Sequence, residues 1–250
     1  MLRALNTLPQ QAPEDMQDFG QAFRLAFELV FSADADLVEI IGLSLRVSLA
    51  AVAMACLIGL PLGAAVGTTR FAGRNAVLIL LNSLMGLPPV VVGLLVYLML
   101  SRAGPFGVFG LLYTPTAMII AQTILIIPIV AALSRQVIED LHTEYAEQFR
   151  SLRVPAHTAI GALLWDARYS LITVALAGFG RAVAEVGAVI IVGGNIDNLT
   201  RVMTTAIALE TSKGDLALAL ALGMVLMVLA LGVNALAMSL RMSAGRQAYA

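Results

Sequence analysis

The amino-acid sequence predicts an all-α membrane protein with about five transmembrane helices. Hydrophobic residues make up 60% of the 250 residues and charged residues only 12%, whereas soluble domains contain about 45–50% and about 25%, respectively. The charged residues are also clustered, so that long apolar stretches lie between them, and about 20 apolar residues are enough for a helix to cross a bilayer. The same composition excludes an intrinsically disordered chain and a coiled coil.

The N-terminal segment, residues 1–36, is predicted to lie outside the apolar core of the membrane. Residues 1–18 are polar and lack the basic start, apolar run and cleavage site of a signal peptide. Apolar residues in 19–32 recur close to helical spacing, but the stretch is too short to span. We therefore interpret it as a helix in the membrane interface. The alternative is a sixth, tilted span that begins near residue 17.

Five predicted spans form the transmembrane domain, which we assign to residues 37–250. Each centres on a stretch without charged residues, except that the fourth contains Arg181 and Glu185. The third is placed after a stretch rich in glycine and proline that begins at Gly104, because these residues favour turns. The predicted spans are residues 40–68, 75–101, 115–135, 169–192 and 216–240.

A pair of prolines interrupts the second predicted span. Pro88 and Pro89 have no backbone N–H to donate, so carbonyl groups one turn earlier lose their helical partners. Non-helical backbone at membrane depth is tolerated where it lines a cavity or packs against other parts of the protein. Pro88 and Pro89 are therefore candidates for lining a pathway through the membrane, with packing alone as the alternative.

Basic residues near the span ends predict the orientation. The larger group follows the first, third and fifth spans, and this side is expected to face the cytoplasm. The N-terminus is then outside and the C-terminus is cytoplasmic. The residues on the predicted cytoplasmic side are Arg70, Arg74, Arg135, Arg150, Arg153, Arg168, Arg241 and Arg246.

The segment 136–168 is predicted to be a helical hairpin on the cytoplasmic side. Its apolar residues recur every three or four positions, which favours two short amphipathic helices. Pro155 divides them, because proline disfavours helix at the residue before it. A compact helical hairpin between two membrane spans is suited to binding a partner protein. A solvated helical loop without a partner is the alternative.

The hairpin contains Glu147, Ser151-Leu152 and a run from Trp165 to Arg168. In these residues it resembles the cytoplasmic signature loop of bacterial ABC-importer permeases. In that family the loop forms a coupling helix that sits in a cleft of the ATPase subunit. This sequence departs from the pattern, since Gln148-Phe149 replace two alanines, Arg153 stands at an expected glycine and Trp165 near an expected proline.

The resemblance implies which residues contact the ATPase, and the loss of the glycine suggests a different turn between the two helices. The implied ATPase-coupling residues are Glu147, Phe149, Ser151, Leu152, Arg153, Pro155, His157 and Trp165.

Arg181 and Glu185 lie near the middle of the fourth predicted span. Charges at this depth usually face the protein interior or water, and a spacing of four residues places both on one helix face. One interpretation is an ion pair that only fixes helix packing. The other is a pathway lining in which Arg181 faces a passing anion. Asn195, in the turn after this span, is a further candidate for the pathway.

Three short runs contain or follow Arg181 and Glu185: Gly178–Ala182, Glu185–Ala188 and Gly193–Asn195. They resemble the oxyanion branch of these permeases, which imports molybdate, tungstate and sulfate, while residues 81–93 and 199–215 look most like tungstate permeases. The resemblance covers about residues 40–240 and implies a type I ABC importer permease in the bacterial cytoplasmic (inner) membrane.

The resemblance also implies the partners. Two copies of the chain would form a homodimer that encloses the pathway, in contact with membrane lipid. An ATP-binding cassette ATPase dimer would bind below, and a periplasmic or lipid-anchored oxyanion-binding protein would deliver the anion. No cofactor is expected on this chain, because ATP and Mg would lie on the ATPase.

Other classes have less support from the residues. The single Cys56 excludes an internal disulfide, two histidines disfavour a His-rich metal centre, and the sequence around Lys213 lacks the phosphate-binding loop of ATPases. A net charge of −1 gives no case for nucleic acid. The alternatives are a molybdate or sulfate permease of the same family, and a channel or secondary transporter that works without an ATPase. A membrane enzyme that uses Glu185 or His157 has the least support.

Overall fold

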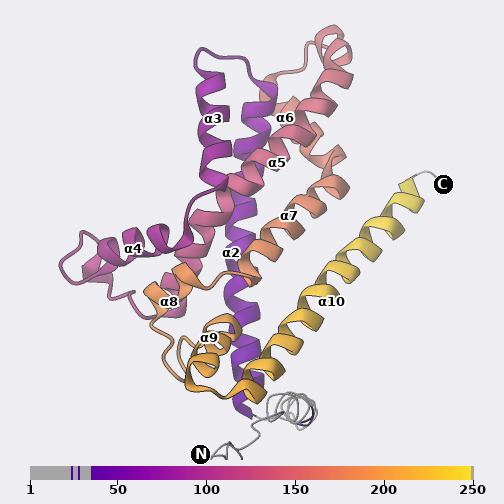
Figure 1. The fold of residues 1–250 in the computed structure, drawn as a ribbon. Helices are drawn as coiled ribbons and strands as arrows, with labels where there is room; N and C mark the ends of the chain where they lie inside the picture. The colour runs from indigo at the N-terminus through magenta and orange to yellow at the C-terminus, as the bar shows by residue number, and fades with distance from the viewer. Residues whose placement is uncertain (1–23, 25–27, 29–34, 249–250) are drawn as a thin grey trace, which may run out of the picture.

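The computed structural model describes residues 35–248, together with Arg24 and Glu28. The predicted interfacial helix at 19–32 and the alternative sixth span therefore lie outside the described residues, apart from these two positions. Within the described part, the chain forms α-helices and one short 3-10 helix, and no β-strand is present there. The predicted all-α class is confirmed (Figure 1).

Two long helices, α2 (Ala35–Thr68) and α5 (Pro115–Ser151), pack against each other at the centre of the molecule. Three glycines four residues apart on α2, Gly59, Gly63 and Gly67, allow this approach. A Cβ atom on Gly63 would lie 2.0 Å from Ser134 Oγ and 2.4 Å from the carbonyl oxygen of Ala131. Small residues at this spacing let helix backbones come close in membranes. The spacing is visible in the sequence, but our sequence analysis did not identify it.

The second predicted span is two helices, α3 (Arg74–Met85) and α4 (Pro89–Leu100), which meet at an angle of 97°. The predicted break at the proline pair is confirmed, and the second predicted span, 75–101, corresponds to this bent pair. The pair is bent because Pro88 and Pro89 cannot continue the hydrogen bonding of α3. Helix α4 runs sideways to reach α8 (Gly187–Gly193) (Figure 1).

Helix α5 begins at Pro115 as predicted but continues without a break to Ser151. The predicted end of the third span at residue 135 is therefore wrong, and the first helix of the predicted hairpin is the end of α5. No glycine or proline separates the apolar and amphipathic parts of this helix after Pro128, so nothing local ends it. The second hairpin helix is α6 (Ala156–Asp166), which starts after Pro155 as predicted.

The fourth predicted span is also interrupted. Three residues separate the end of α7 (Arg168–Val183) from the start of α8, so the prediction of one helix over 169–192 is wrong. The sequence analysis did not predict α9 (Met203–Lys213), while α10 (Leu216–Ala248) extends beyond the predicted end at residue 240. The stretch predicted as turns after Gly104 contains only the 3-10 helix η1 (Gly107–Phe109).

Among the residues that the structure describes, three helical segments are long and apolar enough to cross a membrane: Leu37–Thr68, Pro115–Ser151 and Leu218–Ser239. The number rises to five if each of two bent pairs counts as one span: α3 with α4, and α6 with α7, which meet at 76°. The five predicted spans agree with this upper number. The most apolar part of α5 is 61% buried and that of α10 only 17%, so α5 belongs to the core and α10 to the periphery.

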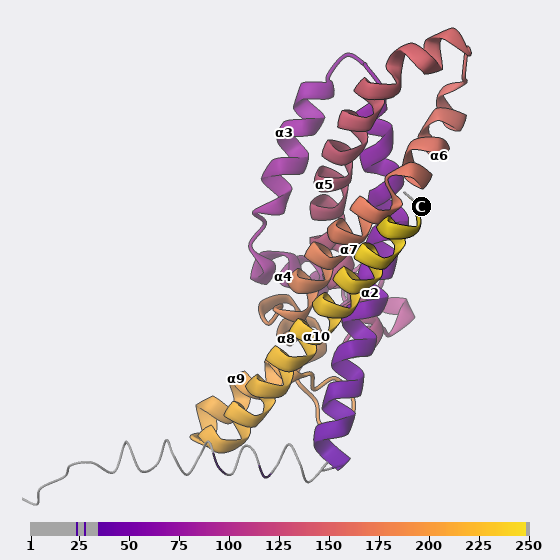
Figure 2. The same ribbon diagram turned by 90° about the vertical axis from the view of Figure 1, so that its right-hand side faces the viewer.

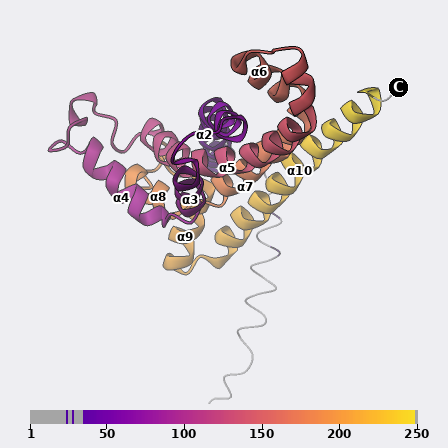
Figure 3. The same ribbon diagram turned by 90° about the horizontal axis from the view of Figure 1, so that it is seen from above.

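The α2–α3 and α5–α6 connections lie at one end of the molecule and α9 at the other (Figures 1 and 2). We call these the α5–α6 end and the α9 end. Seen from above, α4 and α10 lie on opposite sides of the central helices (Figure 3). Successive spans cross the membrane in opposite directions. The α2–α3 connection follows the first predicted span and the α5–α6 connection follows the third, so both must lie at the same end. Which side of the membrane this end faces stays a prediction.

Candidate functional site

Glu185 lies in the break between α7 and α8, where its carboxylate is only 3% exposed. Arg181 Nη1 donates a hydrogen bond to Glu185 Oε2 over 2.5 Å. The other oxygen, Oε1, accepts from the backbone N–H of Ala188 over 2.9 Å. This N–H is in the first turn of α8 and has no partner within that helix. The carboxylate therefore both pairs with Arg181 and caps α8.

The same break is tied to α9. Thr204 Oγ1 donates to the backbone carbonyl of Glu185 over 2.9 Å, and the backbone N–H of Met203 donates to Ser44 Oγ on α2 over 2.7 Å. These contacts connect α7, α8, α9 and α2. They support the interpretation of Arg181 and Glu185 as a pair that fixes packing. Arg181 retains 29% exposure of its side chain, and its role toward an anion stays a prediction.

The two interrupted spans meet where they are broken. A Cβ atom on Gly187, at the start of α8, would lie 2.8 Å from Val90 Cγ2, at the start of α4. A Cβ atom on Gly93 of α4 would lie 2.7 Å from the Cα atom of Ala188. We call residues 86–90 and 184–187 the paired break. The sequence analysis singled out residues on both sides of it without predicting that they meet.

The remaining pathway candidates occupy different environments. Pro88 is exposed and Pro89 partly buried, so both lie at the surface of the paired break. Asn195 lies past the other end of α8, with a positive φ of 51°. Its Oδ1 atom is buried and has no hydrogen-bond partner among the described residues. The structure thus places Pro88 and Pro89 with Glu185, whereas Asn195 belongs to the turn at the α9 end.

Gln122 on α5 is a polar residue in the membrane core that the sequence analysis missed. It is only 3% exposed, and its Nε2 donates to the carbonyl of Ala182 over 3.1 Å. Its Oε1 has no partner among the described residues. It lines a cavity of about 20 Å³ together with Ser44, Ser48 and Thr204, a volume that suits one water molecule. The sequence did contain a signal for this residue, since Gln122 is an amide side chain within a long apolar run.

The predicted ATPase-coupling residues lie on the end of α5, on the turn that follows it and on α6, where Trp165 is close to the start of α7. Leu152 is 71% exposed and Trp165 72% exposed, and the guanidinium group of Arg168 lies 4.9 Å from the centre of the Trp165 ring. Phe149 differs, since it is partly buried and its ring lies 6.2 Å from that of His142. The other predicted coupling residues are exposed: Glu147, Ser151, Arg153, Pro155 and His157.

The turn between α5 and α6 has a left-handed residue at Arg153, whose φ is 52°. The N–H of Val154 donates to the carbonyl of Phe149 over 3.0 Å, and such a bond after a helix end typically accompanies a left-handed residue, most often glycine. The expectation that losing the glycine changes the turn relative to that of the family stays a prediction. The arginine adopts the conformation that glycine favours.

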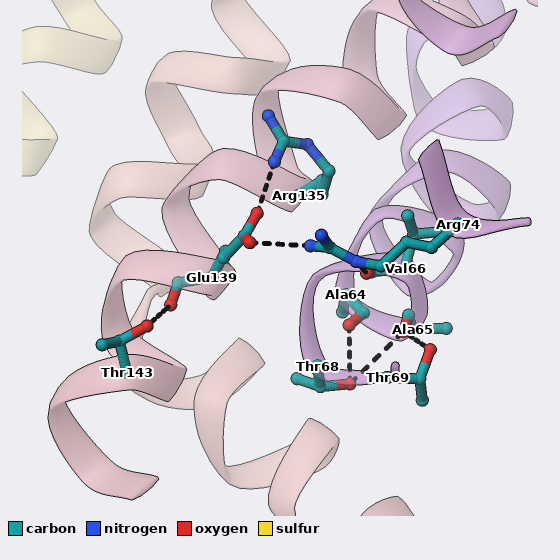
Figure 4. A network of polar contacts seen from close by, with 9 residues as sticks. All are labelled: Ala64, Ala65, Val66, Thr68, Thr69, Arg74, Arg135, Glu139 and Thr143. Atoms are coloured by element: carbon teal, nitrogen blue, oxygen red, sulfur yellow. Dashed lines mark hydrogen bonds and ion pairs between the residues drawn. The ribbon is translucent and has the colours of Figure 1, made fainter. Parts of the chain in front are cut away.

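A network at the α5–α6 end attaches the α2–α3 connection to α5 (Figure 4). Arg74 donates through Nη2 to Glu139 Oε1 over 2.7 Å and through Nε to the carbonyl of Val66 over 3.2 Å. Arg135 pairs with the other oxygen of Glu139. Glu139 lies beyond the apolar part of α5.

Comparison with known proteins places these features in a wider group. Residues 59–241 match the protein-family model described as binding-protein-dependent transport system inner membrane component. The chain is 43% identical to a "Probable anion ABC transporter permease protein" of Haloferax volcanii, over 72% of this chain and 80% of that protein. It is 40% identical to the "Tungstate uptake system permease protein TupB" of Peptoclostridium acidaminophilum, over 82% of this chain and 90% of the relative. The protein of the same name from Campylobacter jejuni is 37% identical, over 78% and 82%.

Proposed function

Because this chain belongs to the family of binding-protein-dependent transport system inner membrane components, we propose that it is the permease subunit of an ATP-driven tungstate importer. The similarity to tungstate uptake permeases of two bacteria, over most of their length, carries the proposal. The chain is a multi-pass membrane protein and a transport subunit. The choice of tungstate as the substrate rests on the names of these relatives, because the geometry of the chain does not distinguish one tetrahedral anion from another.

We propose that two copies form the translocation pathway and that an ATP-binding cassette ATPase dimer, carrying ATP and Mg, binds at the α5–α6 end. The exposed side chains of Leu152 and Trp165 support this assignment, because apolar groups of this size gain most from burial against a partner. A periplasmic or lipid-anchored binding protein would deliver the anion at the α9 end. The α5–α6 end then faces the cytoplasm, with the N-terminus outside.

The continuity of α5 supports a route for coupling. One helix extends from Thr114, its N-cap at the α9 end, through the packed centre to the turn at Leu152. A displacement of this turn by the ATPase would move α5, which is one continuous helix with a proline at position 128. The hydrogen bond from Gln122 to the carbonyl of Ala182 would pass the movement to the end of α7, beside the paired break.

Two alternatives remain as hypotheses. A molybdate or sulfate permease would share the fold, since all three substrates are tetrahedral dianions. A channel or secondary transporter without an ATPase draws its support from charges within the membrane. The capping contact that Glu185 makes with α8 gives these charges a structural role, which weakens that support.

Metal content in the native host tests the proposal. We expect deletion of this chain to lower cellular tungsten selectively when cells grow in nanomolar tungstate and molybdate, as measured by mass spectrometry. Restoring the gene should restore tungsten. Selective loss of molybdenum would reassign the substrate within the family, and unchanged levels of both metals would contradict the import of either anion.

A further inference from the structure

A cavity of about 1120 Å³ opens at the α5–α6 end, between the α2–α3 connection and the last turns of α5. Its lining contains four arginines and one carboxylate, which gives a net charge of 4 − 1 = +3. The carboxylate is Glu139, already paired with two arginines. The lining arginines are Arg70, Arg74, Arg150 and Arg153.

Three of these arginines have free guanidinium groups. Arg74 is held by Glu139, whereas the side chains of Arg70, Arg150 and Arg153 are exposed and form no ion pair or hydrogen bond with any described residue. Because Arg153 is also a predicted ATPase-coupling residue, Arg70 and Arg150 are the two that are left for another ligand. Guanidinium groups present planar pairs of donors that match the oxygen atoms of a phosphate-type oxyanion. Several of them around one cavity therefore favour such an anion.

The lining is apolar as well as basic. Phe71 follows Arg70 in the α2–α3 connection and is 44% exposed, and Phe149, Val154 and Ala159 contribute on the opposite side. The connection begins directly after Thr68, the last residue of a helix long enough to span the membrane. The cavity therefore lies near the level of lipid headgroups. Basic pockets between helices at this level are a common setting for acidic lipids.

We propose that this cavity binds the phosphate group of an acidic phospholipid from the cytoplasmic leaflet. A phospholipid supplies both an oxyanion for the arginines and apolar groups for Phe71 and its neighbours. A free anion would use only the arginines. The proposal rests on the orientation given under the proposed function but not on tungstate as the substrate.

The experiment uses the full transporter, purified with its ATPase, in nanodiscs of phosphatidylcholine with increasing phosphatidylglycerol. Lipid retained on the protein is measured by native mass spectrometry. The test variant is Arg70→Gln/Arg150→Gln, which leaves the predicted coupling residues intact. The matched control is Arg46→Gln/Arg102→Gln, because both arginines are exposed and lie away from the cavity.

We expect the wild type and the control to retain phosphatidylglycerol preferentially. The test variant should bind it roughly 30-fold more weakly, at about 1 kcal/mol for each arginine. Arg70→Lys/Arg150→Lys, which keeps the charge, should retain part of the preference, and this pair guards against a simple folding defect. Equal retention by the wild type and the glutamine variant would overturn the proposal.

Two further results would overturn the lipid as the source of the anion. One is saturable binding of inorganic phosphate or tungstate in pure phosphatidylcholine that depends on Arg70 and Arg150 and abolishes the lipid preference. The other is loss of the ATPase from the glutamine variant with unchanged lipid binding. That result would assign the cavity to an acidic segment of the partner protein.

Discussion

The carboxylate of Glu185 performs two tasks, since it pairs with Arg181 and caps the first turn of α8. Both contacts are local, but the break that makes them possible is not encoded in the local sequence. The apolar run from Tyr169 to Val192 contains no proline. Val90 at the start of α4 and Thr204 on α9 contact the break, and a single sequence does not reveal contacts between such distant positions.

Neutral variants separate the two interpretations of this pair. Arg181→Ala should destabilise the protein by about 1.5–3 kcal/mol, because it leaves the buried carboxylate with only a backbone partner. Arg181→Gln/Glu185→Gln should recover much of this stability in thermal unfolding. If Arg181 faces the anion, the double variant should still transport at least about tenfold more slowly in vesicles. Transport at the wild-type rate would leave the pair a purely structural role.

Arg153 provides a second test at the scale of one residue. A left-handed conformation costs a non-glycine residue about 1 kcal/mol, so Arg153→Gly should raise the free energy of unfolding by up to that amount. Arg150→Gly is the matched control, since position 150 lies in the last helical turn of α5. There glycine should lower stability by about 1 kcal/mol. Equal effects of the two substitutions in thermal unfolding would contradict this account of the turn.

At the scale of elements, the close contact between α2 and α5 depends on Gly63. Gly63→Ala should destabilise the protein by about 1–3 kcal/mol, because the new Cβ atom meets backbone as well as the side chain of Ser134. Gly42→Ala on the same helix meets no atom within 4 Å. This control should be neutral or slightly stabilising. A smaller loss for Gly63→Ala than for the control would show that the helices do not pack this closely.

The elements also show what the sequence could predict. Pro88, Pro89 and Pro155 mark helix ends that the structure confirms, because proline acts through its own backbone. The end of α5 was misplaced, since hydrophobic periodicity does not distinguish a new helix from the continuation of an old one. The paired break, the clustering of Arg70 with Arg150 and the Glu139 network were not predicted. Each joins residues far apart in the chain.

At the scale of the whole molecule, the proposed function requires partner proteins. The proposed binding of the ATPase at the α5–α6 end can be tested most clearly. Leu152→Asp/Trp165→Ala should reduce copurification of the ATPase at least about tenfold, because exposed apolar anchors typically contribute 2 kcal/mol or more when buried in an interface. Val108→Asp is the control, since Val108 is 95% exposed and lies in η1, far from that end. Normal ATPase recovery with the double variant would place the docking surface elsewhere.

Uptake by purified components tests the central claim most directly. The chain would be reconstituted in vesicles together with its ATPase. The oxyanion-binding protein would be added on the side of the membrane that does not carry the ATPase. We predict ATP-dependent accumulation of tungstate that a hundredfold excess of sulfate does not abolish. Accumulation without ATP or without the ATPase, or equal ATP-driven uptake of sulfate in the presence of the same binding protein, would contradict the account.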